Sequence, residues 1–172
     1  MTFEPPALPG GRRIPPYGVA EKDMLAAYLD FHRATLKWKI EGLSEDDAKR
    51  SMTPSGTNLL GIVKHVAYVD RWWFQDVFAG RDCEYPWTDE DPDADFRIEP
   101  GETIESVFGL YDAECEKSRA IVAAASLDDV AARVKERGYT LRWIVLHMIE
   151  EIARHNGHAD IVRELIDGAT GE

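Results

Sequence analysis

The stretch WIVLHMIEEIARHNGHADIVRELID, residues 143–167, combines a strong helical pattern with the most informative polar side chains of the chain. Its apolar residues recur at helical spacing, which predicts one long amphipathic helix. At about 100° per residue, four polar residues fall within about an 80° arc: His147, Glu151, His155 and His158. Glu151 and His155 lie inside the apolar stripe, where a lone carboxylate would be costly to bury. Their i, i+4 spacing therefore indicates a pair of metal ligands.

The rest of the chain supplies three more helical segments and no strand pattern. We expect four long helices, at residues 20–41, 59–79, 102–125 and 141–166. Thr140 is a suitable cap for the last helix, and Gly168 suits its end. Clustered proline and glycine predict an extended arm at residues 1–19, and the proline-containing acidic segment 81–100 predicts a long crossover. The prediction is an all-α four-helix bundle over residues 20–168.

Composition narrows the function classes. The net charge is −12, from 32 acidic and 20 basic residues, and no basic run is present, so nucleic acid is disfavoured as a partner. The N-terminal segment has no apolar signal region, and the chain has no 18-residue apolar run, so we expect a cytoplasmic protein without a membrane partner. Cys83 and Cys115 lie outside any CxxC spacing, which suits a reducing compartment.

A third metal ligand has to come from another helix. His65 borders the apolar face of the segment 59–79, where a histidine taken alone is more often structural. If the second and last helices are neighbours, however, His65 joins Glu151 and His155 in a set of two histidines and one carboxylate. Such a set leaves coordination positions open, as in catalytic zinc sites and in non-haem iron enzymes.

Two segments carry a family resemblance: PSGTNLLGIVKHVAYVDRWWF, residues 54–74, and LRWIVLHMIEEIARHNGHADIVRELIDG, residues 141–168. They resemble the signature helices of the DinB-like superfamily, in its actinobacterial branch, and the likeness covers most of residues 20–168. The resemblance implies up-down-down-up wiring with the long crossover between the second and third helices. It also implies a divalent metal, Zn²⁺ with Ni²⁺ or Fe²⁺ as alternatives, held by His65, Glu151 and His155.

The same resemblance suggests the chemistry. Many members have histidine where this chain has Glu151, a variation also present in the mycothiol-dependent maleylpyruvate isomerases. The resemblance implies that the thiol substrate is a low-molecular-weight one such as mycothiol. Family members often form dimers, so a homodimer is one of the partners that the resemblance suggests. The HRGQ-like segment of the family reads HNGH in this chain, so His158 replaces a glutamine.

Three further residues are candidates for supporting roles. His147 and His158 flank the proposed ligands by about one turn, where they could transfer protons or act structurally. Arg142 is a weaker candidate for holding an anionic group, because a surface salt bridge is the commoner role. His32 has no identifiable partner and is assigned nothing.

Two other sequence patterns, the alternating aspartates and the tryptophans, are interpreted as structural features and not as functional sites. Asp91, Asp93 and Asp95 alternate as in a calcium loop, but Phe96 stands where that loop needs glycine, so a solvated acidic loop is expected. The tryptophans could line a pocket, but we expect them in the core: Trp72, Trp73, Trp87 and Trp143.

The leading functional hypothesis is a metal-dependent S-transferase that joins a small thiol to an electrophilic substrate. A hydrolase of a small substrate would use the same three ligands. A metal-stabilised binding protein without turnover is a second class of function, favoured if His147 or His158 closes the coordination sphere. In a third, an interaction protein, the histidines are structural and the purified protein carries no metal.

Overall fold

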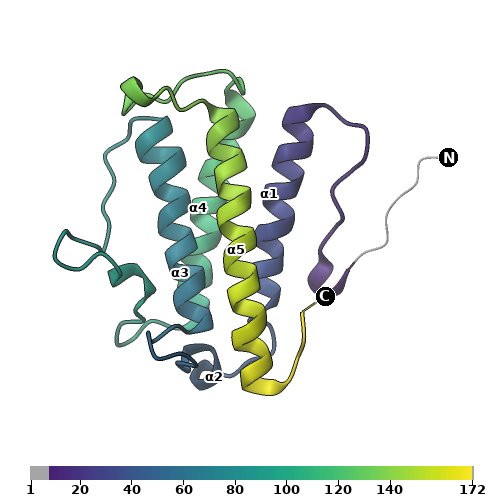
Figure 1. The fold of residues 1–172 in the computed structure, drawn as a ribbon, viewed down its shortest axis with the longest axis vertical. Helices are drawn as coiled ribbons and strands as arrows, with labels where there is room; N and C mark the ends of the chain where they lie inside the picture. The colour runs from purple at the N-terminus through teal and green to yellow at the C-terminus, as the bar shows by residue number, and fades with distance from the viewer. Residues whose placement is uncertain (1–7, 172) are drawn as a thin grey trace.

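The computed structural model describes residues 8–171, whose regular structure is helical (Figure 1). The five α-helices are α1 (Glu21–Trp38), α2 (Glu45–Lys49), α3 (Leu59–Asp70), α4 (Ile104–Ala124) and α5 (Leu141–Asp167). Short 3₁₀ turns occupy Pro9–Gly11, Ala94–Phe96 and Lys135–Arg137. Among the described residues the only extended pairing is an isolated bridge between Val130 and Thr140. The predicted all-α class is confirmed.

The two helices that form the site begin at the expected residues. Asn58 caps α3 by accepting a hydrogen bond from the Gly61 amide at 2.8 Å, and Thr140 caps α5 by accepting one from the Trp143 amide at 3.3 Å. Gly168 ends α5 in the left-handed conformation, with φ of 78°. The predicted helix 59–79 differs in its second part, because Arg71–Phe78 winds as a π-helix.

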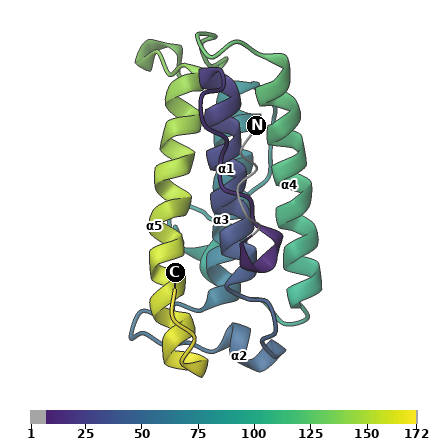
Figure 2. The same cartoon turned by 90° about the vertical axis from the view of Figure 1, so that its right-hand side faces the viewer.

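The long helices pack as two neighbouring pairs. α3 packs most extensively against α4, and α1 against α5. The colour gradient shows that α3 and α4 run in one direction and that α1 and α5 run in the other (Figure 1). The crossover from residue 81 to residue 103 returns the chain along the bundle so that α4 can start beside the start of α3. The view turned by 90° shows α1 in front of α3, with α5 on the left and α4 on the right (Figure 2).

The crossover is held tightly against α3. Gly61 makes this approach possible, because a Cβ added there would lie 2.1 Å from the carbonyl oxygen of Phe96. Ala94 and Asp95 in the same segment are buried. The predicted solvated acidic loop is therefore wrong for Asp95, whose side chain is only 4% exposed.

The bundle core is apolar but contains buried ions. Its largest fully buried side chains include Tyr111, Phe74, Leu29, Leu60, Ile62, Leu141, Ile144, Met148 and Ile152. Within it Arg33 pairs with Asp70 and donates to Ser118 Oγ at 2.6 Å. None of the helices in the described part of the chain is long and apolar enough to cross a membrane.

Of the predicted N-terminal arm, residues 1–7 lie outside the described residues. The described part of the arm contains the 3₁₀ turn Pro9–Gly11 and no other helix before α1. Arg12 is buried, with its guanidinium 4.0 Å from the ring centre of Trp38. This stretch therefore packs against the end of α1.

Candidate metal centre

Helices α3 and α5 bring together His65, Glu151 and His155. One ligand atom from each of the three lies within 4.8 Å of the others. Glu151 Oε1 is central, at 3.2 Å from His155 Nε2 and 3.6 Å from His65 Nε2. The three side chains are 10% to 16% exposed, so the cluster is largely shielded from solvent.

The local sequence explains this convergence. Glu151 and His155 are four residues apart on α5 and so are neighbours on the helix surface. His65 lies two turns into α3, among buried residues such as Ile62 and Val66. Because α3 and α5 run in opposite directions side by side, the imidazole of one helix meets the pair of the other (Figure 1).

Asp95 orients His65, a relationship that the sequence did not reveal. His65 Nδ1 and Asp95 Oδ2 are 2.8 Å apart. One ring proton of His65 is donated to this carboxylate, and Nε2 faces Glu151 and His155, where it can offer its lone pair to a metal ion when it carries no proton. Phe96 stacks on the His65 ring at a centroid distance of 3.8 Å and covers it. The crossover thus supplies both the hydrogen-bond acceptor and the apolar cover of one ligand.

The electrostatics of the cluster act differently on Glu151 and on His65. Hydrogen bonds with His155 and then His65 hold the pKa of Glu151 far below its usual range. Burial lowers the pKa of His65, but Asp95 and Glu151 outweigh this effect and raise it. Glu151 is therefore an anion at neutral pH, placed between two imidazoles.

The donor set fits a divalent transition metal. Two imidazole nitrogens and one carboxylate oxygen are the ligand types of catalytic zinc sites, whereas calcium and magnesium prefer oxygen ligands alone. The carboxylate that orients His65 also matches the usual surroundings of metal-bound histidine. His155 departs from that pattern, because its buried Nδ1 has no hydrogen-bond partner among the described residues.

His147 and His158 lie beside the cluster and outside the set of ligand atoms. His147 Nδ1 is 3.7 Å from Glu150, and its ring stacks on Trp143 at 5.0 Å. His158 is exposed and meets the His155 ring edge-on at 5.4 Å. Both positions are compatible with the supporting roles that the sequence suggested.

Arg142 and His32 have partners elsewhere. Arg142 pairs with Glu21, at 2.8 Å, and with Asp128, which is the arrangement of a surface salt bridge. Its guanidinium is thus already engaged by two carboxylates. The His32 carbonyl accepts a hydrogen bond from Asn156 Nδ2 at 3.1 Å, which joins α1 to α5.

The tryptophans divide into two groups. Trp73 is 6% exposed, as expected for a core residue, but Trp72 and Trp143 are 41% and 42% exposed. The core expectation is therefore wrong for these two. Trp143 lies on the outer side of α5, and Trp72 lies on the π-helical turn. Helical periodicity alone does not distinguish these two positions from positions that face the core.

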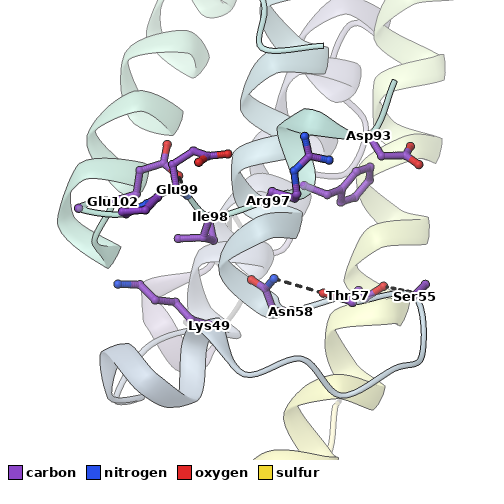
Figure 3. A pocket seen from close by; sticks show the side chains of 13 residues that line it. Lys49, Ser55, Thr57, Asn58, Asp93, Arg97, Ile98, Glu99 and Glu102 are labelled. Carbon is purple, nitrogen blue, oxygen red and sulfur yellow. Dashed lines mark hydrogen bonds between the residues drawn. The ribbon is translucent and has the colours of Figure 1, made fainter. Parts of the chain in front are cut away.

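A cavity of about 910 Å³ lies on the other side of Phe96 from His65, and none of the three proposed ligands lines it (Figure 3). It lies between the loop before α3 and the last part of the crossover, and Phe96 belongs both to its wall and to the cover of His65. Its labelled lining is mostly polar and includes Ser55, Thr57, Asn58, Asp93 and Arg97. Its volume is in the range of small-molecule sites.

Comparison with known proteins gives a family match and a fold match. A family model described as mycothiol-S-transferase matches residues 24–168. A crystal structure of a conserved protein from Enterococcus faecalis superposes with a TM-score of 0.65 at 13% identity, covering 88% of this chain and all of that one. This second likeness shows a shared fold. None of the curated proteins matches the sequence.

Proposed function

Because the chain belongs to the mycothiol-S-transferase family, we propose that it is a metal-dependent S-transferase whose thiol substrate is mycothiol or a similar small thiol. The observation that carries this proposal is the convergence of His65, Glu151 and His155, with three ligand atoms within 4.8 Å. We propose Zn²⁺ as the ion, because two imidazoles and one carboxylate form a common catalytic zinc set.

The residues of the centre have distinct roles in this proposal. His65 and His155 offer Nε2, and Glu151 offers an anionic oxygen that reduces the net charge of the site. Asp95 fixes the tautomer and the ring orientation of His65. Phe96 shields that ring from water.

The reaction is a substitution at an electrophilic carbon. A divalent ion bound by this set would lower the pKa of a coordinated thiol and so populate the nucleophilic thiolate at neutral pH. The thiol proton passes to solvent or to a neighbouring base, for which His158 is our candidate and His147 the alternative. The sulfur then forms the new C–S bond, and the leaving group departs with its bonding electron pair.

We propose that the polar body of the thiol substrate occupies the cavity of Figure 3. Hydroxyl, amide and charged groups line it, and these can donate to and accept from a hydrophilic ligand. A homodimer and a cytoplasmic location are parts of the same proposal that follow from the family.

The decisive assay is turnover with a panel of low-molecular-weight thiols, including mycothiol, against chlorobimane and chlorodinitrobenzene. We expect one thiol to be strongly preferred, with activity lost in Glu151→Ala and kept in the matched control His32→Gln, which changes a histidine on α1 outside the centre. Bound metal without turnover for any thiol would overturn the transferase proposal in favour of a hydrolase or a binding protein. Equal loss in both variants would contradict the assignment of the centre.

A further inference from the structure

Aromatic side chains of α5, of Tyr139 just before it and of the π-helical segment contact one another in a continuous cluster next to the metal centre. Tyr139 and Trp143 have ring centroids 4.5 Å apart, and Trp143 and His147 have centroids 5.0 Å apart with only 18° between their planes. Trp73 meets Tyr139 and His147 edge-on, at 5.3 and 5.0 Å. We call these four residues, with Trp72, which contacts Trp73 at 4.7 Å, the aromatic ladder.

The ladder adjoins the metal-ligand turn along both helices. His147 precedes Glu151 by four residues, which is about 6 Å along α5. Trp73 follows His65 by eight residues, and His147 precedes His155 by eight. Because α3 and α5 run in opposite directions, these equal separations place Trp73 beside His147 in the same way that His65 lies beside His155.

The ladder combines a buried anchor with exposed rings. Trp73 is 6% exposed and fixed in the core, whereas Trp72 and Trp143 leave 41% and 42% of their surface accessible. The side chain of His147, between Trp143 and the ligand turn, is 28% exposed. Large exposed aromatic groups held rigid by neighbours are typical of binding surfaces.

The chemistry of the ladder selects among possible electrophiles. Indole and phenol rings are electron-rich on their faces, so they stack favourably with a flat, electron-poor ring. The charged neighbour of His147 is Glu150, and Arg142 is already paired with two carboxylates. With a net charge of −12 on the chain, an anionic electrophile is disfavoured here.

We infer that the aromatic ladder binds the electrophilic co-substrate, and that this co-substrate is an uncharged, electron-poor aromatic compound. The inference rests on the proposed function, because it uses the metal centre as the place where the thiol sulfur is held. The ring lies against Trp143 and His147 with its reactive carbon toward Glu151. The sulfur bonds to that carbon, and the leaving group departs as an anion with its bonding pair.

Binding can be tested separately from turnover with 1,3-dinitrobenzene, a neutral electron-poor ring without a good leaving group. Equilibrium dialysis on the purified protein, without thiol, gives its Kd. We expect Trp143→Ala to raise this Kd by about tenfold and Trp143→Phe by about threefold or less, in line with the usual strength of one aromatic pair. The matched control Trp87→Ala removes a tryptophan that contacts Tyr68 and Tyr85 instead, and should leave the Kd unchanged.

Kinetics supply the second readout. Trp143→Ala should raise KM for chlorodinitrobenzene and leave KM for iodoacetamide, which has no ring, at the wild-type value. An equal change for both electrophiles, or a Kd for 1,3-dinitrobenzene that Trp143→Ala does not alter, would overturn the inference. If Trp143→Ala fails to fold, Trp143→Phe carries the same test with the smaller expected shift.

The two proposals fail in different ways. Absence of turnover with every thiol would remove the transferase proposal, while the dialysis result would still decide whether the ladder binds aromatic rings. A wild-type protein that does not bind 1,3-dinitrobenzene and sediments as a dimer, with Trp143→Ala sedimenting as a monomer, would show that the ladder is a subunit contact. That result would overturn the inference.

Discussion

His65 and Asp95 are 30 residues apart in the chain, yet His65 Nδ1 and Asp95 Oδ2 are 2.8 Å apart in the folded protein. This hydrogen bond joins α3 to the crossover and directs the other ring nitrogen of His65 toward Glu151. The proposed metal centre therefore depends on a loop that contributes no ligand.

Asp95→Asn tests this dependence. The amide keeps the shape of the side chain but cannot accept as a carboxylate does, so His65 loses its charged acceptor. We expect metal affinity to fall by about 10- to 100-fold, the usual effect of losing such a partner. Competition with a chromophoric chelator measures it. Asp93→Asn, on the exposed side of the same loop, is the control, and equal affinity in the two variants would refute the orienting role.

Gly61→Ala tests the close packing of the crossover on α3. The new Cβ would lie 2.1 Å from the Phe96 carbonyl oxygen, so the segment that carries Asp95 must move. We expect the free energy of unfolding to fall by about 1–3 kcal/mol, with weaker metal binding. Urea unfolding of Gly109→Ala provides the control, because that helical glycine of α4 has open space around its Cβ position. The control should gain about 0.5–1 kcal/mol, and a similar gain in Gly61→Ala would contradict the packing.

The buried carboxylate of Glu114 predicts how the stability of the protein depends on pH. Burial raises its pKa, but hydrogen bonds from Arg71, Lys117 and Gln75 outweigh burial and hold the pKa below its ordinary value. A depressed folded-state pKa contributes stability above the unfolded pKa of about 4.3, and this contribution is lost as the pH falls through the folded value. The wild-type protein should therefore have a larger free energy of unfolding than Glu114→Gln, and this difference should be largest at pH 6–7.

Urea midpoints at pH 7 and at pH 3.5 measure the effect. The gap between wild type and Glu114→Gln should narrow at the lower pH, where the stabilisation by the Glu114 carboxylate is being lost. Glu116→Gln, whose carboxylate on the same helix is 78% exposed, should show no such gap at either pH. A gap for Glu114→Gln that widens on acidification would have the wrong sign for this account.

Local sequence patterns sufficed for the helices and for part of the site. Helical periodicity and capping residues define α3 and α5, and the i, i+4 rule pairs Glu151 with His155 from their spacing alone. Predicting His65 as the third ligand required one assumption about which helices are neighbours. The family resemblance indicated that these two helices are neighbours. The spacing of residues within a single helix cannot show this.

The remaining features depend on tertiary packing. Asp95 lies in a loop without periodicity, and its burial follows from the approach that Gly61 allows. The exposure of Trp143 depends on which side of α5 faces the bundle, and Trp72 lies in the π-helical segment Arg71–Phe78, whose winding departs from the 3.6-residue period. Neither effect leaves a signal in the order of apolar residues.

The shared metal centre is tested by the metal content of purified, untagged protein, measured by elemental analysis for wild type and for His65→Ala. His65 is the one ligand from a different helix, so its loss separates a shared centre from a site on α5 alone. We expect about one divalent ion per chain in wild type and a small fraction of that in His65→Ala, with helicity unchanged. Equal metal content in the two proteins, or none in wild type, would contradict the shared metal centre.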